Sequence, residues 1–456
     1  MKNLRLTIAL LISLILMSSC TQEIIVEELQ EDNHIEKAEI SSLGNKPTVD
    51  YSSNEIVIRY KKENITEVEK KIIRDSIADL YSFNIKTITR SNYHTDLNIE
   101  LWELAFDGDT TNGSQDGYIE DVVSGLSSKE DDEADIEGDY QFLIQMQDLE
   151  GINGDFIRNL TVPSETAETL NGANVAIIDT GIHYGISNQP FLYDTSNLNG
   201  SDQEISGWDF VDGDEIPFDE HGHGTMVSAI ILQNLDTQNV PYQILPVRAF
   251  DETGKGTYFD IVSAMAYIAS IDDEFIVNAS FGFYGLGKYN VFKGLIEDNS
   301  DKLLLVCSAG NYGVDTEVYS HYPSGFNSSN LIAVGGYEEV NPKPPTSGSR
   351  IIDGYAREDY SNYGKIKIDA LAQYSHDISL QFQDGMTYNA NVEGTSFSSA
   401  ITTARVAFLW YKNSGFGTSL GLKESVLETT YISSNSNVVS EVVDGKILVT
   451  DYMHLP

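Results

Sequence analysis

The sequence predicts an α/β protein in which a mainly parallel sheet lies between helices, preceded by a small α+β domain. Two patterns support this prediction. From residue 166 to residue 456, short continuous apolar runs alternate with helical periodicity, and such runs are typical of strands buried on both faces of a parallel sheet. Over residues 50–145, three segments of strand character alternate with two helix patterns, which favours a separate, smaller unit.

The first twenty residues have the pattern of an export signal. Two basic residues precede an apolar run over residues 6–17, and small residues lead to Cys20. The run is shorter than the roughly 20 apolar residues that a membrane-spanning helix needs. Residues 16–20 resemble the lipoprotein signal, so we expect a signal peptide over residues 1–20 and lipid attachment at Cys20. The protein would then be anchored to a bacterial membrane, facing the periplasm or the cell surface. An ordinary secretory peptide is the alternative.

The charge balance excludes one class of partner. The chain has 28 basic and 70 acidic residues, which gives a net charge of −42. Such a field repels nucleic acid and anionic membranes, so we expect no nucleic-acid partner and membrane contact only through the lipid anchor. A hydrophobic fraction of 41% and a charged fraction of 21% exclude a disordered chain. We interpret the acidic surface as a means of keeping an exported monomer soluble.

The segment after Cys20 is an acidic tether, predicted over residues 21–49. In the α+β domain that follows, residues 55–60 and 99–104 have strand character. Thr66 and Glu69 form a capping box that begins a helix. We expect one face of this helix to carry the apolar residues Val68, Ile72, Ile73, Ile77 and Leu80.

The second half of this domain is less regular. A helix is predicted over residues 119–125, and the carboxylate-rich run over residues 130–139 is interpreted as a self-repelling loop. Residues 140–146 regain strand character. The weakly periodic residues 146–165 are expected to form a linker to the larger domain, which begins at residue 166.

Strands and helices alternate regularly in the larger domain. Strands are predicted over residues 175–178, 275–278, 303–307 and 331–334, with helices over residues 225–233, 261–270 and 397–410. Chemistry in such sheets gathers where the strands end. Cys307 lies inside a continuous apolar strand, which predicts an inert core thiol. Because Cys20 is the only other cysteine, no internal disulfide is expected in the folded part.

Three polar side chains stand at the ends of predicted elements. Asp179 directly follows a strand, His223 opens a helix, and Ser396 opens another. A serine hydroxyl becomes a good nucleophile when an imidazole accepts its proton, and a carboxylate orients that imidazole. Each residue alone is more typical of a helix cap or a strand end. Together they supply the groups that nucleophilic acyl transfer requires.

The chain order and the flanking residues resemble the subtilisin-like serine protease family (subtilases, peptidase S8). The matching segments are Asp179-Thr180-Gly181, Gly222-His223-Gly224-Thr225 and Gly394-Thr395-Ser396. The resemblance implies a subtilisin-like three-layer fold over residues 166–456 and a serine endopeptidase that acts on proteins or peptides without a required cofactor. By that match, Asp179 orients the base, His223 is general base and then general acid, and Ser396 attacks the scissile carbonyl.

The same resemblance assigns further site residues. Asn311, in Ser308-Ala309-Gly310-Asn311, matches the residue whose amide stabilises the oxyanion. Substrate is expected to pair as an extra strand along one edge of the cleft, with residues 254–258 at the opposite edge. The walls of the pocket for the side chain before the scissile bond would be Ser280, Phe281, Gly282, Ser308, Ala309 and Gly310.

The domain over residues 50–145 resembles the inhibitory propeptide of the family. We expect it to assist folding and to block the cleft as an intramolecular inhibitor. The enzyme itself would then cleave the exported zymogen between about Gln141 and Thr166.

Several residues leave alternatives open. His221 is a rival for the general base, and His183 is interpreted as a loop residue. Calcium is a possible ligand, because Asp212, Asp214 and Asp219 offer the oxygen atoms that it binds, although no complete loop motif is present. The sequence departs from the family at Ala400, where a proline is usual; alanine is a good helix former, so we expect altered packing rather than lost chemistry.

Two rival functions follow from these departures. A catalytically silent fold of this family, acting as a surface binding module, is supported by Ala400 and by the large charge. An esterase using the same three groups is disfavoured, because the Gly-x-Ser-x-Gly motif is absent around Ser396.

Overall fold

The computed structural model describes residues 49–94, 96–106, 115–127, 136–146, 172–185, 192–195, 206–285, 287, 289–343, 345, 349–382, 385–415 and 417–449. The chain divides into two units, Met1–Pro47 and Thr48–Pro456, and all described residues belong to the second. The predicted signal peptide with Cys20 and nearly all of the tether and the linker therefore lie outside the described residues. Within the described part, no helix is both long and apolar enough to cross a membrane.

The N-terminal part forms an antiparallel sheet that carries two helices. Its strands stand in the order β2-β3-β1-β4, and β4 continues the sheet onto β8, a strand of the larger domain. The elements are β1 (Tyr51–Tyr60), α3 (Glu67–Tyr81), β2 (Phe83–Arg90), β3 (Ile99–Phe106), α4 (Gln115–Ser127), β4 (Ile136–Gln145) and β8 (Lys255–Thr257). The predicted strands and helices of this domain are all present, each extended by a few residues.

Helix α3 begins as predicted, but the side of the helix that packs on the sheet is not the apolar side that we predicted. Thr66 is the N-cap, and its side chain and that of Glu69 form the expected capping box. Of the five apolar residues assigned to the inward face, only Ile77 is buried. Three others have 60–72% of their surface exposed: Val68, Ile72 and Leu80. The predicted face is therefore wrong.

Buried ion pairs explain this orientation. Lys70 and Arg74 are the other buried residues of α3. Arg74 donates to Glu100, a fully buried carboxylate on β3, at 2.8 Å, and Lys70 donates to Asp96 at 2.6 Å. Leaving the buried carboxylate of Glu100 without a cationic partner would cost far more free energy than exposing an isoleucine side chain to water. The basic side of the helix therefore packs on the sheet, and apolar periodicity alone gave the wrong side.

The carboxylate-rich run is partly a strand. Residues 130–135 lie outside the described residues, but Ile136–Asp139 begin β4, and Asp139 is 3% exposed. Its carboxylate accepts hydrogen bonds from the backbone N–H of Asn290 at 3.0 Å and of Val291 at 2.7 Å. These groups begin α7 (Asn290–Glu297), so Asp139 caps this helix of the larger domain. The loop prediction is therefore wrong for residues 136–139.

The larger domain is built on a ten-stranded sheet in the order β14-β18-β19-β15-β13-β11-β9-β5-β7-β6. The central strands from β15 to β6 are parallel. The strands are β5 (Ala173–Asp179), β6 (Trp208–Asp209), β7 (Tyr242–Arg248), β9 (Phe275–Ala279), β11 (Leu303–Ser308), β13 (Leu331–Lys343), β14 (Ile351–Arg357), β15 (Ala370–Gln373), β18 (Tyr431–Ser433) and β19 (Lys446–Ile447).

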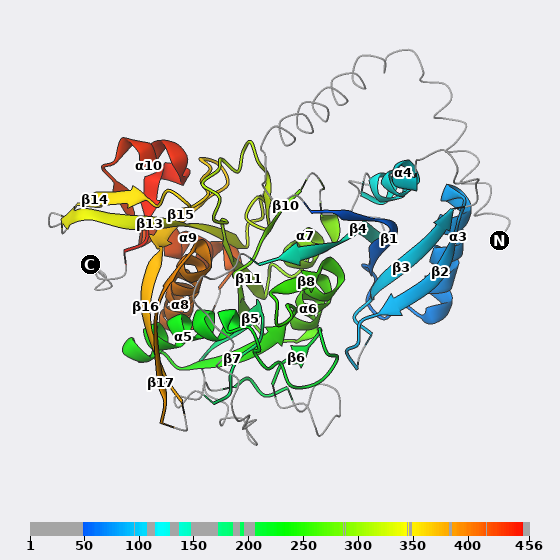
Figure 1. Cartoon of the computed structure of the whole chain (residues 1–456), viewed down its shortest axis with the longest axis horizontal. Coiled ribbons are helices and arrows are strands. Elements are labelled where there is room, and N and C mark those ends of the chain that lie inside the picture. The colour runs from blue at the N-terminus through cyan, green and yellow to red at the C-terminus, as the bar shows by residue number, and fades with distance from the viewer. Residues whose placement is uncertain are drawn as a thin grey trace, which may run out of the picture. The chain divides into compact units, whose positions relative to one another are not determined.

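Helices cover both faces of this sheet, as the three-layer prediction requires (Figure 1). One apolar core holds side chains of α5 and α8 against the sheet, and a second holds side chains of α6 and α7 against the opposite face. The helices are α5 (His223–Thr237), α6 (Tyr258–Ser270), α7, α8 (Thr395–Asn413), α9 (Ser419–Glu428) and α10 (Ser436–Glu441). Because successive strands are parallel, the carboxyl ends of β5, β9 and β11 lie side by side at one edge of the sheet.

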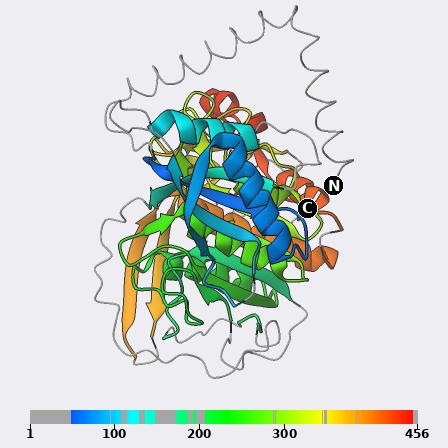
Figure 2. The same ribbon diagram turned by 90° about the vertical axis from the view of Figure 1, so that its right-hand side faces the viewer.

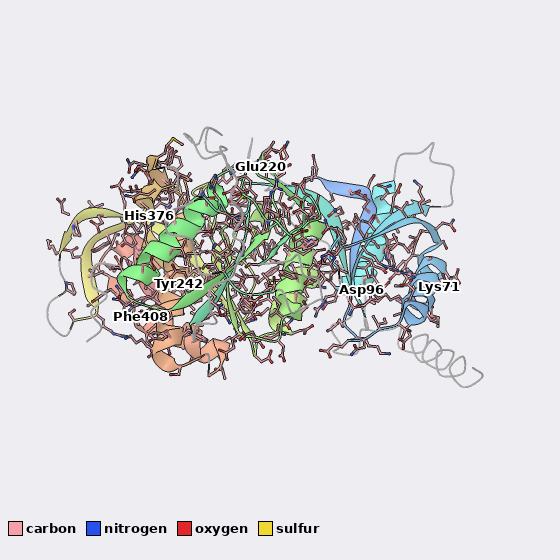
Figure 3. The ribbon with its side chains drawn as sticks, turned by 90° about the horizontal axis from the view of Figure 1, so that it is seen from below. Lys71, Asp96, Glu220, Tyr242, His376 and Phe408 are labelled. Atoms are coloured by element: carbon pink, nitrogen blue, oxygen red, sulfur yellow. The ribbon has the colours of Figure 1, made fainter. Side chains whose placement is uncertain are left out.

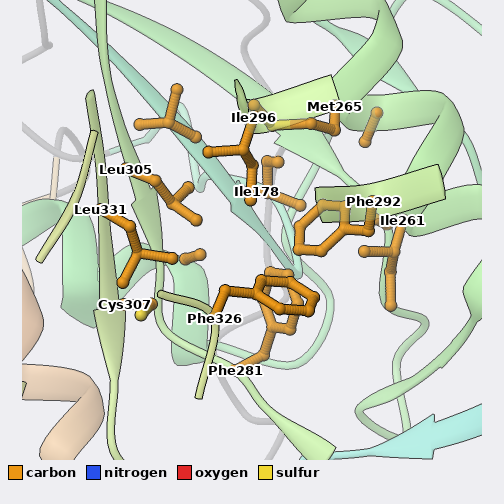
Figure 4. Close-up of a cluster of buried hydrophobic side chains, with 14 of the residues drawn as sticks. Ile178, Ile261, Met265, Phe281, Phe292, Ile296, Leu305, Cys307, Phe326 and Leu331 are labelled. Atoms are coloured by element: carbon orange, nitrogen blue, oxygen red, sulfur yellow. The ribbon is translucent and has the colours of Figure 1, made fainter. Parts of the chain in front are cut away.

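The core on the α6 and α7 face contains the second cysteine. Figure 4 shows Cys307 among the side chains of this cluster, with Leu305 and Leu331 nearby. Its thiol is fully buried and free. Burial raises the pKa of the Cys307 thiol far above the ordinary range, so it stays protonated and unreactive, as predicted for a core thiol.

The N-terminal sheet packs against the same face. Val57 and Phe142 belong to the same buried cluster as Tyr258 of α6 and Phe292 of α7. The ring of Phe142 stacks on that of Tyr258 with centroids 4.7 Å apart. Figure 2 shows α3 and α4 on the side of the N-terminal sheet that faces away from α6.

The hairpin that precedes α8 lies at the end of the larger domain away from the N-terminal domain. The hairpin of β16 (Ser375–Gln381) and β17 (Thr387–Glu393) leads directly into α8. In Figure 3, His376 of this hairpin and Phe408 of α8 lie at the opposite end from Lys71 and Asp96 of the N-terminal domain. A short β10 (Phe283–Tyr284) pairs with β12 (His321–Tyr322). Residues 443–447 form a short 3-10 turn and the strand β19.

Candidate active site

The first two predicted site residues are in direct contact. Asp179 is the last residue of β5, and His223 is the first residue of α5. Nδ1 of His223 lies 2.7 Å from Oδ1 of Asp179, and both side chains are at most 2% exposed. The same oxygen accepts from the backbone N–H of Thr180 at 2.8 Å. The other oxygen, Oδ2, is buried without a hydrogen-bond partner among the described residues.

The Asp179 carboxylate sets the basicity of the ring. Burial lowers the pKa of His223, but the charge of Asp179, its hydrogen bond and the charge of Asp219 outweigh burial. The pKa of His223 therefore lies above its ordinary value of 6.5. This environment suits a ring that accepts a proton and holds it as an imidazolium.

Asp219 holds the loops that carry these two residues. Its Oδ1 accepts from Thr180 Oγ1 at 2.8 Å and from the backbone N–H of His221 and Gly222 at 3.0 and 2.7 Å. Its Oδ2 accepts from the N–H and the hydroxyl of Thr225 at 2.8 and 2.6 Å. One buried carboxylate thus ties the end of β5 to the first turn of α5.

The proposed calcium ligands are engaged in protein contacts. Asp212 pairs with Arg248 at 2.6 Å, and Oδ1 of Asp214 accepts from the backbone of Ile216. Asp219 makes the five bonds above. No group of three or more metal-binding side chains occurs in the described part of the chain. The prediction of calcium stays untested.

Ser396 is the second residue of α8 and is partly exposed, although the residues that follow it are buried. Its hydroxyl donates to the carbonyl oxygen of Ser280 at 3.0 Å. No hydrogen bond joins Ser396 to His223 among the described residues. The helix nevertheless adjoins the ring, since the rings of Phe397 and His223 have centroids 5.7 Å apart.

A buried polar network fixes this end of α8 to β9. Asn278 of β9 donates to the hydroxyl of Ser280 at 2.8 Å, and that hydroxyl donates to the carbonyl of Ser396 at 2.9 Å. Thr403, two turns along α8, donates to the side-chain oxygen of Asn278 at 2.9 Å. Ala400 lies fully buried between these contacts in an uninterrupted helix. The departure at position 400 therefore leaves α8 regular.

Asn311 lies beside the start of the serine helix. Its Oδ1 accepts from the backbone N–H of Thr395 at 2.8 Å, and Thr395 Oγ1 accepts from Gly310 N at 3.0 Å. These bonds leave two donors without partners among the described residues, namely the amide nitrogen of Asn311 and the backbone N–H of Ser396. Two free donors next to the hydroxyl form an arrangement that stabilises an oxyanion.

The predicted pocket walls follow two neighbouring strands. Ser280–Gly282 extend β9 and Ser308–Gly310 end β11, and Ser308 Oγ donates to the carbonyl of Phe281 at 3.4 Å. The side chain of Phe281 is buried in the core (Figure 4), and that of Ala309 is buried as well. These two residues therefore offer only backbone to a ligand.

The other predicted edge of the cleft is already paired. β8 forms an antiparallel pair with β4, in which Ile144 faces Gly256 and Gln145 faces Lys255. The backbone N–H of Met146 continues the ladder to the carbonyl of Gly254 at 2.8 Å. The end of the N-terminal sheet thus pairs with the segment that we expected at the edge of the cleft opposite the substrate strand.

Three residues that contact this site were not predicted to do so from the sequence. Asn278 resembles any strand residue until its partners on α8 are known, and Asp219 was considered only as a calcium ligand. His321, buried between Gly282 and Gly310, had no sequence pattern to single it out. His221 and His183, weighed earlier, make backbone contacts with Asp219 and Thr225.

Comparison with known proteins agrees with this geometry. A family model described as the Subtilase family matches residues 171–446, more than half of the chain. The chain is 32% identical to the thermophilic serine proteinase of Bacillus sp. (strain AK1) over 186 residues, which is 38% of this chain and 40% of that protein. It is 30% identical to thermitase of Thermoactinomyces vulgaris over 179 residues, 38% of this chain and 58% of that protein.

A longer match of 323 residues at 26% identity covers 68% of this chain and 31% of the cell wall-associated protease of Bacillus subtilis (strain 168). The chain thus spans between 31% and 58% of the length of these relatives. Among solved structures, a cold adapted subtilisin-like serine proteinase matches with a TM-score of 0.45 and 22% identity, over 64% of this chain and 94% of that one.

Proposed function

Because the chain belongs to the Subtilase family, we propose that it is a serine endopeptidase that hydrolyses peptide bonds through an acyl-enzyme on Ser396. The observation that carries this proposal is the buried hydrogen bond of 2.7 Å between Asp179 and His223, beside the helix that presents Ser396. A buried carboxylate–imidazole pair next to a partly exposed hydroxyl is the arrangement that activates a serine.

The proposed reaction begins when the Ser396 hydroxyl leaves the Ser280 carbonyl and turns to His223. Nε2 of the ring accepts the hydroxyl proton while Oγ attacks the carbonyl carbon of the substrate. Asp179 holds Nδ1–H and stabilises the imidazolium. The ring then gives the proton to the leaving amine, and an acyl group remains on Oγ. Water attacks this ester by the same steps in reverse. These steps use only protein groups and water, so we propose that no cofactor is required.

The developing negative charge is stabilised by two donors. The backbone N–H of Ser396 stands in the first turn of α8, where backbone N–H groups have no helical partners. The amide nitrogen of Asn311 is the second donor. Because both are already in place before the reaction, little reorganisation is needed when the tetrahedral intermediate forms.

We further propose that the protein is made as a zymogen and that the N-terminal domain blocks its cleft. The support is the pairing of β4 with β8 and of Met146 with Gly254, because residues 254–258 are the segment that we expect at one edge of the cleft. The capping of α7 by Asp139 and the apolar contacts of Phe142 hold the domain there. The predicted cleavage window between Gln141 and Thr166 lies mostly outside the described residues.

Self-processing is tested by intact-mass analysis of the purified chain beside its Ser396→Ala variant. We expect the wild-type chain to lose its N-terminal part and the variant to remain uncut. If both stay uncut, or both are cut at the same position, self-processing is excluded.

Export and lipid anchoring at Cys20 are part of the same proposal. The name of the cell wall-associated relative supports a location outside the cytoplasm. Fractionation of cells that produce the full chain tests the anchor: the wild-type protein should stay with the membranes, and Cys20→Ala should move to the soluble fraction. Equal partition of both proteins would contradict lipid attachment.

Substrate class is tested with a mixed peptide library and a panel of short-chain esters. An endopeptidase cuts internal peptide bonds of the library, whereas an esterase acts on the esters alone. A silent binding module does neither, and the intact Asp179–His223 pair makes that alternative the weaker one.

A further inference from the structure

One buried histidine lies between the two segments that we assign to the substrate pocket. His321 belongs to β12, which pairs with β10, and its side chain is 2% exposed. A Cβ atom added to Gly310 would lie 2.9 Å from Nε2 of His321, and one added to Gly282 would lie closer still. The imidazole therefore lies against the Cα atoms of both glycines, in the space between the ends of β9 and β11.

The ring is held in this position from behind. Nδ1 of His321 lies 2.7 Å from Oγ of Ser324, and the ring of Tyr284 packs edge-on with centroids 4.9 Å apart. Tyr284 is in turn hydrogen-bonded to Asn362, whose amide also donates to the carbonyl of Ala309 at 2.7 Å. A ring fixed on one side by these contacts does not swing out of the pocket without breaking them.

The other ring nitrogen has no such contact. Nε2 makes no hydrogen bond with any described residue and lies on the side of Gly282 and Gly310. Burial lowers the pKa of His321 to about 3, so the ring is uncharged at neutral pH. The space between the two glycines is thus filled by a neutral, rigid group rather than by a charge that would attract an acidic or basic side chain.

Glycines on two facing walls normally leave room for a large side chain between them. Here an imidazole takes up that room. We propose that His321 is a specificity-determining residue that shortens the pocket for the side chain before the scissile bond, so that the enzyme cleaves after small residues such as glycine, alanine and serine. This inference rests on the proposed peptidase function and names its substrate class.

The test uses the full chain after self-processing and four peptides that differ only in the residue before the scissile bond: alanine, serine, leucine or phenylalanine. Each methylene that a pocket cannot accept lowers kcat/KM by about tenfold or more. We expect wild-type protein to favour alanine and serine over leucine and phenylalanine by at least that factor. His321→Gly and His321→Ala should raise kcat/KM for phenylalanine and leucine about tenfold and leave the alanine peptide nearly unchanged.

Tyr360→Ala, which removes an exposed ring, is the control and should keep the wild-type profile. The inference is overturned if wild-type protein cleaves after phenylalanine as well as after alanine. It is equally overturned if active His321→Gly keeps the wild-type ratio. Should both variants fail to fold, the wild-type ratio alone decides.

Labelling with a fluorophosphonate distinguishes failure of the role proposed for His321 from failure of the proposed peptidase function. Protein that labels at Ser396 but prefers large residues contradicts the role of His321 alone. Protein that neither labels nor cleaves contradicts the peptidase function itself.

Discussion

The hydroxyl of Ser396 donates a hydrogen bond of 3.0 Å to the carbonyl oxygen of Ser280. Ser280 directly follows β9, where we expect a substrate strand to pair, so the proposed nucleophile rests against the expected substrate-binding segment instead of the proposed base. Its proton must pass to His223 for attack. A substrate that takes the Ser280 carbonyl for its own backbone N–H would release the hydroxyl and couple binding to activation.

Removal of either group of the proposed catalytic pair should abolish turnover. Ser396→Ala and His223→Ala should each lower kcat by about 10⁶-fold, the loss found in subtilisin, and the double variant should lose scarcely more, because the residues act as one unit. Single-turnover and steady-state hydrolysis of one peptide measures this, with each inactive variant first cleaved in trans by wild-type enzyme that is then removed. Independent, multiplying losses would contradict a shared mechanism.

The pH dependence should follow the pKa of His223. Because that pKa lies above 6.5, the rate should rise with pH from about 6 to 8 as the ring loses its proton. Asp179→Asn removes the charge that outweighs burial, so the rising limb should move to lower pH while kcat falls by about 10⁴-fold. The full pH profile of kcat/KM for both proteins decides this. An unmoved limb would show that Asp179 does not act on the ring.

Asn311 should affect the transition state rather than binding. Asn311→Ala removes one of two oxyanion donors and should lower kcat by about 10²–10³-fold, the loss known from subtilisin, with KM nearly constant. Its Oδ1 also holds Thr395, so Asn311→Asp is the matched variant that keeps this contact and loses the donor. Comparable kcat losses in both variants support the donor role, whereas full activity of Asn311→Asp argues against it.

Asp219 should act as a positioning residue. Asp219→Ala leaves several buried donors of the two catalytic loops unpaired, at about 1–3 kcal/mol for each lost partner. We expect a lower unfolding temperature together with a lower kcat, and a partial recovery of both in Asp219→Asn. Differential scanning calorimetry and peptide kinetics measure the two effects. A drop in stability with unchanged kcat would limit Asp219 to folding.

Docking of the N-terminal domain should weaken as pH rises. Burial raises the pKa of Asp139 from 3.8 to about 7, although Tyr258, Val291 and Asn290 all donate to it. A carboxyl with a raised pKa binds more protons in the folded state, so its contribution to stability is complete below about pH 4 and is lost as pH rises to about 7. Asp139→Asn does not titrate and should lack this loss.

Thermal unfolding of the Ser396→Ala chain, with and without Asp139→Asn, measures this between pH 4.5 and 8. The advantage of the asparagine variant should grow up to about pH 7 and then stay level. A constant difference across the range would show that Asp139 does not titrate there.

Many strands of the large sheet could be predicted from the sequence, because a strand that is buried on both faces must be continuously apolar. Residues 175–178 and 303–307 are of this kind. Because Asp179 and the loop of Asn311 directly follow these strands, their position at the carboxyl edge of the sheet could be predicted from the sequence alone. Short patterns were also sufficient for the capping box of Thr66 and for the start of α5 at His223, since both depend on neighbours within a few residues.

What the sequence did not predict depends on distant partners. The inward face of α3 is set by Glu100 on another strand, and the burial of Asp139 is set by the first turn of α7. The resting hydrogen bond of Ser396 and the position of His321 depend on the spacing of β9 and β11. The spacing between two strands cannot be predicted from the residues of either strand alone.

The central claim is that His223 activates Ser396, and active-site labelling tests it most directly. Self-processed wild-type protein and His223→Ala, whose N-terminal domain is first removed in trans by wild-type enzyme, are treated with a fluorophosphonate and mapped by peptide mass spectrometry. We predict one adduct, on Ser396, that forms faster as pH rises from 6 to 8 and is nearly absent in the variant. No adduct on Ser396, or equally fast labelling without His223, would contradict the claim.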